Sequence, residues 1–192
     1  MRPILCGPAV LACAALLACG GGGGGSVAPP PGPIASFRCV DSAPAVDHVA
    51  LRCGLQVAPD EWQIDVVVGV PTTSKDINGF DFYLVFDPLH LAFVPGSEER
   101  GNLLGESVLL AAATATNPDD PGRLIVGINR TGGTGVQGLI GKERIMSFRI
   151  KALTVAPFGP EMPAFENREA FDSSNQAVPE IEFIDQLLLS VE

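Results

Sequence analysis

The side chains that could do catalytic chemistry are few in this sequence. His48 and His90 are its only histidines, and the chain contains no Gly-x-Ser-x-Gly motif, no P-loop and no HExxH motif. His90 lies in the segment DPLHL, which is typical of a surface turn, and neither histidine lies at metal-ligand spacing. We therefore expect a protein that is not an enzyme, with no catalytic residue, no cofactor and no metal site.

Two loop segments offer weaker binding chemistry. Asp119 and Asp120, in NPDDPG, could supply oxygen ligands to calcium. Calcium needs about six to eight oxygens from more than one place, so a solvated turn is the favoured interpretation. The segment TGGTGVQG, residues 131–138, has the glycine content of a phosphate-binding loop, but it precedes no helix pattern. We interpret it as a turn between two strands.

The cysteines give a clearer signal, beginning at the N-terminus. An apolar run, Ile4 to Ala18, follows Arg2; it is shorter than the roughly 20 residues of a membrane span and suits a secretory signal peptide. Its end, Leu-Leu-Ala-Cys at residues 16–19, resembles the lipobox of bacterial lipoproteins, in which the cysteine receives a diacylglycerol. We expect residues 1–18 to be a lipoprotein signal peptide and Cys19 to be lipidated. An ordinary signal peptide cut nearby is the alternative.

A tether follows the expected lipidation site. Residues 19–33 are rich in glycine and proline, and six consecutive glycines, which have no side chains to bury, come directly after Cys19. Gly20 is not the aspartate that retains enterobacterial lipoproteins in the inner membrane. We therefore expect an exported protein that is lipid-anchored to the bacterial cell envelope, at the outer membrane.

Two cysteines remain for the folded domain. Cys6 and Cys13 lie within the expected signal peptide, so Cys39 and Cys53 are the only other thiols. Two thiols in an exported chain predict a disulfide, which closes a loop of about 15 residues and stabilises the fold by about 3 kcal/mol.

The charge balance excludes one class of partner. The chain has 12 Lys and Arg against 22 Asp and Glu, a formal net charge of −10. Loss of Arg2 with the signal peptide would make this −11. No basic cluster interrupts the acidic sequence, so we expect no nucleic-acid partner. Residues 34–192 are enough for one domain with a sizeable core.

The elements that must position any site are strands, because the apolar pattern has a period of two. In NGFDFYLVFDP, Phe80, Phe82, Leu84 and Phe86 share one side, which we expect in the core, while Gly79, Asp81, Tyr83 and Val85 share the other. Further strands are predicted at residues 62–70, 91–94, 106–115, 123–129, 144–153, 181–184 and 187–192. The alanine-rich run 109–115 also suits a helix, but its flanking turns favour a strand. Many short strands without a helix pattern indicate an all-β fold, an antiparallel β-sandwich or jelly roll.

Three segments resemble the cohesin domain family. INGFDFYLVFDPLHLAFV, residues 77–94, is similar to the family's third strand with its Phe-Asp-Pro turn. Residues 122–153 are similar to a later strand, turn and Phe-containing strand, and AFDSSNQAVPEIEFID, residues 170–185, to the closing hairpin. The resemblance covers residues 61–192 and implies a cohesin-like β-sandwich with jelly-roll topology. Residues 34–60, which hold the cysteine pair, are less like the usual start of the family, and we expect them to form an atypical, disulfide-stapled N-terminal segment.

This resemblance implies a non-catalytic binding module, a protein–protein adaptor whose partner is a dockerin-like protein. The partner-binding candidates are Asp81 and Tyr83, on the outward side of their strand, and Gly79, where several cohesins carry a partner-contacting asparagine. The alternative is a carbohydrate-binding module that binds polysaccharide through exposed aromatic rings. The sequence has one Trp and one Tyr, and Trp62 shares the side of buried-looking Ile64, so the protein-binding class is favoured.

Overall fold

The computed structural model describes residues 36–69, 76–105, 107–114, 122–132, 135–136, 143–154 and 156–192. These residues form strands, turns and loops, and none of the described ranges contains a helix. The described residues therefore offer no helical segment of the length and apolarity needed to cross a membrane. The strands are β1 (Phe37–Val40), β2 (His48–Ala58), β3 (Glu61–Val68), β4 (Gly79–Val85), β5 (Leu91–Phe93), β6 (Glu99–Arg100), β7 (Val108–Thr114), β8 (Arg123–Arg130), β9 (Glu143–Ala152), β10 (Phe158–Glu161), β11 (Ala164–Phe171), β12 (Glu182–Ile184) and β13 (Leu188–Val191).

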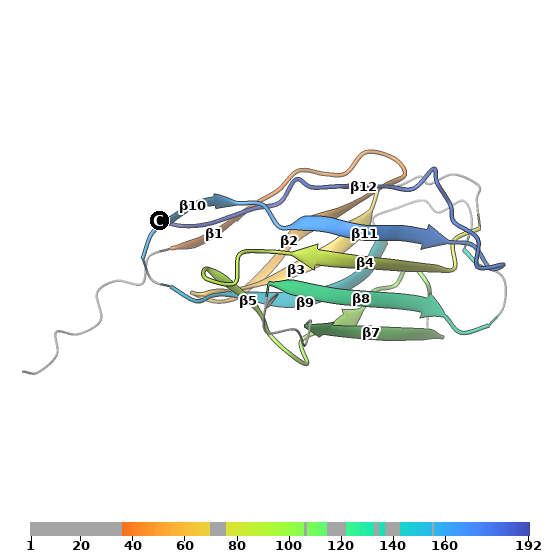
Figure 1. Ribbon diagram of the computed structural model, residues 1–192, viewed down its shortest axis with the longest axis horizontal. Helices are drawn as coiled ribbons and strands as arrows, with labels where there is room; N and C mark the ends of the chain where they lie inside the picture. Colours follow the sequence, from red (N-terminus) through yellow and green to blue (C-terminus); the bar gives the residue numbers. More distant parts are fainter. Residues whose placement is uncertain are drawn as a thin grey trace, which may run out of the picture. The chain divides into compact units, whose positions relative to one another are not determined.

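The strands are arranged in three sheets (Figure 1). One has the order β11-β4-β8-β7, the second has the order β12-β2-β3-β9-β5 with β6 also paired to β9, and a small third sheet has the order β1-β13-β10. Every described strand pair is antiparallel apart from β12 with β2. The predicted all-β, antiparallel sandwich is therefore confirmed.

The alternation in β4 places its apolar side chains in the core, as predicted. Phe80, Phe82 and Leu84 are fully buried and Phe86 is nearly so. The Phe82 ring packs against Phe165 of β11 at a centroid distance of 5.3 Å and Phe183 of β12 at 6.0 Å, so aromatic contacts join the two large sheets. Because successive side chains of a strand point to opposite faces, burial of this set turns Asp81 and Tyr83 away from the core.

The other predicted strands are found within a few residues of their expected bounds. They correspond to β3, β5, β7, β8, β9, β12 and β13. The alanine-rich run, where a helix competed, is β7, paired with β8 over its whole length. In β3, Ile64, Val66 and Val68 are buried as the pattern predicts, while Trp62 is half-buried and donates a hydrogen bond from Nε1 to the Phe37 carbonyl.

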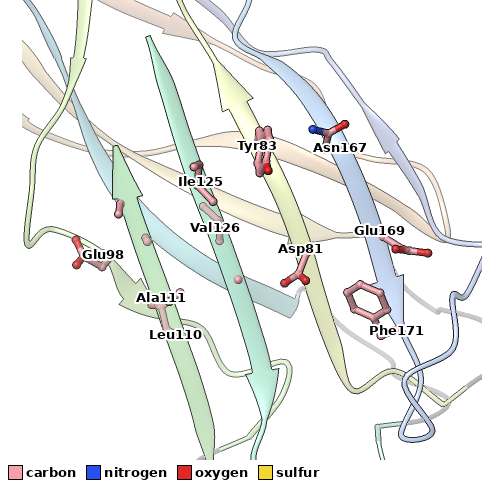
Figure 2. Close-up of a pocket in the computed structure, with 13 residues that line it drawn as sticks. Asp81, Tyr83, Glu98, Leu110, Ala111, Ile125, Val126, Asn167, Glu169 and Phe171 are labelled. Carbon is pink, nitrogen blue, oxygen red and sulfur yellow. The ribbon is translucent and has the colours of Figure 1, made fainter. Parts of the chain in front are cut away.

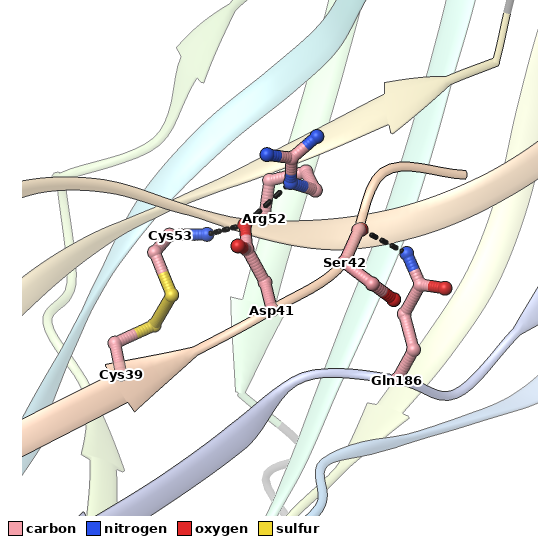
Figure 3. Close-up of polar contacts among 6 residues, drawn as sticks. All are labelled: Cys39, Asp41, Ser42, Arg52, Cys53 and Gln186. Atoms are coloured by element: carbon pink, nitrogen blue, oxygen red, sulfur yellow. Dashed lines mark hydrogen bonds and ion pairs between the residues drawn. A yellow bond between two sulfur atoms is a disulfide. The ribbon is translucent and has the colours of Figure 1, made fainter.

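The N-terminal segment is part of the sandwich. Its strand β2 lies inside the large sheet between β12 and β3, and Val49, Ala50 and Leu51 are all buried. The predicted Cys39–Cys53 disulfide is confirmed, with Cα atoms 5.9 Å apart, and it links β1 to β2 (Figure 3).

A polar cluster reinforces the disulfide. The Asp41 carboxylate accepts hydrogen bonds from the Arg52 side chain and from the Cys53 backbone N–H (Figure 3). Gln186, which precedes β13, donates to the Ser42 carbonyl. These contacts satisfy polar groups where the chain passes between the small sheet and a large one.

The expected closing hairpin at residues 170–185 needs a correction. Its first half is the end of β11, where Phe171 forms an isolated bridge with Ala177. The second half, β12, does not pair with β11 but runs parallel to β2 in the other large sheet. The chain crosses between sheets here because buried Val178, Ile181 and Phe183 fill the core at that end.

Candidate functional site

The solvent-facing side of the sheet β11-β4-β8-β7 is the leading candidate site. We call it the β4 face, defined by the outward side chains of these four strands around Asp81 and Tyr83. Figure 2 shows Asp81 and Tyr83 on β4, Ile125 on β8, Ala111 on β7, and Asn167, Glu169 and Phe171 on β11. A shallow depression of about 750 Å³ lies over this face.

Small residues make the floor of the depression. In the sheet register, Asp81 lies opposite Gly127, which lies opposite Ala111. A Cβ atom at Gly127 would lie 3.1 Å from Asp81 Oδ1, so the missing side chain gives this carboxylate its space. On the next row, Tyr83 lies opposite Ile125, which is 41% exposed. The floor of the depression is thus made of short side chains and is partly apolar, and it lies beside the exposed carboxylate of Asp81.

Asp81 has a like-charged neighbour. Glu169 of β11 is its direct cross-strand partner, and both side chains are exposed. Partial burial raises the pKa of Asp81 above its ordinary value, and the negative charge of Glu169 raises it further. Neither carboxylate has a hydrogen bond or an ion pair to another described residue. Like charges directly opposite in a sheet are destabilising, so this pair is held at some cost to the fold.

Tyr83 has a cationic neighbour. The Arg123 guanidinium carbon lies 5.5 Å from the centre of the Tyr83 ring, and an Arg123 nitrogen lies 3.0 Å from a carboxylate oxygen of Glu166. The Tyr83 ring is therefore half-buried under its neighbours, and one of its faces is already in contact with a cation.

The third candidate from the sequence, Gly79, lies at the start of β4 and is buried. A Cβ atom there would lie 1.9 Å from Oδ1 of Asn129, its cross-strand partner on β8. Gly79 therefore gives room to Asn129 and presents no surface of its own. We leave Gly79 out of the proposed binding surface.

The outward side of the other large sheet differs in its charges. There, Glu61 pairs with Arg149 at 2.6 Å and Asp65 pairs with Arg144 at 3.4 Å. Asp60, in the turn between β2 and β3, pairs with Lys151 at 3.2 Å. Each of these carboxylates has a basic partner within the domain, whereas the carboxylates of Asp81 and Glu169 have none among the described residues.

The two histidines lie outside the β4 face. His48 lies 3.3 Å from a carboxylate oxygen of Glu182, and its Nδ1 lies 2.7 Å from the Val46 carbonyl oxygen. His90, expected in a surface turn, is in that turn but is half-buried between Asp87 and Glu161. Within the described ranges, the polar partners of both histidines are a backbone carbonyl and carboxylates, and neither ring is hydrogen-bonded to a serine, threonine or cysteine.

Sequence reasoning missed Glu169, Arg123 and Glu161. The first two reach the β4 face through cross-strand pairing, and β11 was not among the predicted strands. Glu161 lies 74 residues from Asp87, its hydrogen-bonding partner. Asp119 and Asp120 lie outside the described residues, as do residues 133–134 and 137–138 of the loop 131–138.

No protein-family profile and no curated protein sequence matches this chain. Solved structures do match in fold. The second type II cohesin module of the adaptor ScaA scaffoldin of Acetivibrio cellulolyticus has 12% identity and a TM-score of 0.54, covering 72% of this chain and 86% of that chain. A type I cohesin–dockerin complex from Clostridium thermocellum matches with 12% identity and a TM-score of 0.53, covering 78% and 96%. A type II cohesin–X-dockerin complex from Acetivibrio cellulolyticus also matches with 12% identity and a TM-score of 0.53, covering 71% and 93%. The chain therefore has a cohesin-like β-sandwich fold.

Proposed function

We propose that this protein is a non-catalytic binding module of the cell envelope whose β4 face docks a protein partner of the dockerin type. The observation that carries the proposal is the unpaired carboxylate pair, Asp81 and Glu169, beside a low and partly apolar floor. Two of the solved structures with this fold are cohesin–dockerin complexes. The likeness in fold supports a protein partner, and the residues of the β4 face suggest what that partner carries.

The chemistry of the face favours a partner with a basic side chain. A lysine or arginine placed between Asp81 and Glu169 would replace their repulsion with two charge-assisted hydrogen bonds. Gly127 and Ala111 leave room for the rest of such a side chain to lie on the sheet. The exposed Ile125 adds apolar area that would be buried at the same time.

The same face is poorly suited to polysaccharide, the alternative from the sequence. Sugar rings bind best to open aromatic faces. Tyr83 is one of the two aromatic residues that line the depression. Its ring is partly covered by Arg123. Phe171, the other ring at the depression, is half-buried at the end of β11. A row of exposed aromatic rings is thus absent from the described part of the face.

The location of the protein completes the proposal. Lipidation at Cys19 would confine the domain to the outer membrane, and the tether at residues 19–33 would let it reach a partner. Confinement of this kind raises the effective concentration of two binding modules without adding contacts.

The test is affinity measurement on matched variants. Candidate dockerin-like partners encoded by the source organism are titrated against the wild-type protein, Asp81→Asn, Glu169→Gln and Asp60→Asn. We expect the two changes on the β4 face to weaken binding by about 10- to 100-fold each, because each removes a charge-assisted hydrogen bond.

Asp60→Asn serves as the control, because it removes one carboxylate from the opposite sheet region. It should bind like the wild type. Equal affinity for all four proteins would exclude the β4 face as the docking surface. If the protein binds glycans on an array and binds none of the protein partners, the carbohydrate-binding alternative is favoured.

A further inference from the structure

The turn after β4 and the strand β10 bring together three side chains that the β4 face does not use. Asp87 and His90 lie in the turn that follows β4, and Glu161 is the last residue of β10. A nitrogen or oxygen atom from each lies within 4.8 Å of the others. We propose that Asp87, His90 and Glu161 bind a divalent transition-metal ion, for which Zn²⁺ is the best-suited candidate.

The distances within this cluster match a shared ion better than hydrogen bonds. His90 Nδ1 lies 3.4 Å from Asp87 Oδ2 and 3.4 Å from Glu161 Oε2. Hydrogen bonds between nitrogen and oxygen are shorter, about 2.7 to 3.2 Å. Two ligands that each lie about 2.0 to 2.1 Å from a tetrahedral Zn²⁺ are about 3.3 to 3.4 Å apart. Both separations from His90 Nδ1 agree with that spacing.

The Glu161 carboxylate provides a second, independent observation. Its Oε1 accepts a hydrogen bond from the Asp87 backbone N–H, whereas Oε2 is buried and accepts no hydrogen bond. A buried carboxylate oxygen without a donor is unusual in a folded protein. A cation at this position would supply the missing partner.

The remaining contacts hold the His90 ring in the required orientation. Its ring stacks on Phe158 of β10 at a centroid distance of 4.6 Å and an interplanar angle of 5°. The His90 carbonyl accepts a hydrogen bond of 2.7 Å from the Leu153 N–H, which fixes the backbone of the turn. Imidazole nitrogen with two carboxylate oxygens is a common ligand set for Zn²⁺, and water would complete four-coordination.

A metal ion here would join elements of all three sheets. The turn connects β4 and β5, which belong to the two large sheets, while Glu161 belongs to the small sheet through β13. The ion would therefore act as a structural clip that keeps the small sheet against the rest of the domain.

The experiment uses the full exported protein with its disulfide intact. The protein is first treated with a chelator to remove any bound metal. Zn²⁺ is titrated by calorimetry, and Co²⁺ is added as a spectroscopic probe of tetrahedral coordination. We expect one ion per chain and strong visible absorption from Co²⁺. At a free Zn²⁺ concentration about 100 times the dissociation constant, the Tm should rise by about 5 to 10 °C.

Three variants locate the site. His90→Phe keeps a ring to stack on Phe158, and Glu161→Gln keeps the acceptor for the Asp87 N–H, so both variants should fold. Each should lose the Zn²⁺-dependent rise in Tm and weaken binding at least tenfold. His48→Ala removes the other histidine and should bind Zn²⁺ like the wild type.

Two results would overturn the proposal. One is absence of stoichiometric Zn²⁺ binding by the wild-type protein, which would make the cluster an ionic contact of His90 alone. The other is unchanged binding in His90→Phe and Glu161→Gln. Neither result bears on the partner-binding proposal, because that proposal rests on Asp81 and Glu169 and is tested without added metal.

Discussion

At the scale of single residues, Asp81 shows a conflict between folding and surface chemistry. Its backbone is fixed by the burial of Phe80 and Phe82 on either side, so its carboxylate must lie on the outer surface of β4. There it faces Glu169, and the repulsion between the two is not relieved within the described residues. A residue that costs stability without a compensating contact is a reasonable candidate for a functional role.

Asp81→Asn should stabilise the domain at neutral pH. The pKa of Asp81 is raised in the folded state, so between its ordinary value and the raised value the folded protein holds a proton that the unfolded chain has released. Stability therefore falls as the pH rises through this interval, and the variant lacks that loss. We expect a gain of about 0.2 to 0.5 kcal/mol at pH 7 that disappears at acidic pH, measured by chemical denaturation over a pH series.

The control for this measurement is Asp60→Asn, which breaks an exposed ion pair with Lys151. It should be neutral or slightly destabilising at pH 7. A wild-type protein as stable as Asp81→Asn at every pH would contradict the repulsion between Asp81 and Glu169.

Phe82→Ala should strongly destabilise the domain. Phe82 is fully buried and contacts the rings of Phe165 and Phe183, so the change leaves a cavity between the two large sheets. We expect a loss of about 3 to 5 kcal/mol in the free energy of unfolding, measured by urea denaturation. Tyr83→Ala, the adjacent and half-buried position, should lose clearly less; equal losses would mean that the core does not lie on the Phe82 side.

At the scale of elements, β1 and β2 show how the N-terminal segment joins the sandwich. β2 is an internal strand of a large sheet, and β1 is an edge strand of the small sheet. The Cys39–Cys53 disulfide and the Asp41 hydrogen bonds connect the two. The disulfide is therefore a covalent link between the small sheet and a large sheet.

Reduction of the disulfide should destabilise the whole domain. The bond closes a loop with a sequence separation of 14, for which the loss of the cross-link costs about 3 kcal/mol of stability. We expect a lower Tm in the presence of a reductant and in Cys39→Ser/Cys53→Ser, by about 6 to 12 °C. The double variant should not respond to reductant, and a wild-type Tm that is also unchanged by reduction would contradict a stabilising role.

At the scale of the whole molecule, the sequence combines an expected lipid anchor, a tether and a domain with a surplus of negative charge. The sequence has 22 acidic and 12 basic residues, and this negative net charge disfavours binding of the domain to anionic lipid surfaces. An acidic domain on a long tether would thus be kept away from the membrane that anchors it, with its sheets open to a partner.

Cys19→Ser should release the protein from the membrane. If Cys19 carries the lipid, the wild-type protein fractionates with membranes and the variant appears in the soluble fraction. Mass spectrometry of the wild-type N-terminal peptide should find a diacylglycerol on Cys19. An unmodified N-terminus at another residue would contradict the lipidation and favour an ordinary signal peptide.

The sequence by itself determined the class of fold, the strands with strict alternation and the disulfide. In β4, alternation of large apolar residues leaves one arrangement that buries them all. Cys39 and Cys53 are the two cysteines outside the expected signal peptide and lipidation site, which made them each other's expected partners. Period-two alternation did not predict β2. Three consecutive residues of this strand, Val49, Ala50 and Leu51, are buried, and a strand that is covered on both faces shows no alternation.

Only the tertiary structure decided which residues meet across strands. Glu169 faces Asp81, and Glu161 approaches His90, through pairing of segments that are far apart in the chain. The register of β11 and the position of β10 depend on packing of the whole core rather than on any local pattern. The carboxylate pair of the β4 face and the proposed metal site therefore had no signal in the sequence that a local reading could detect.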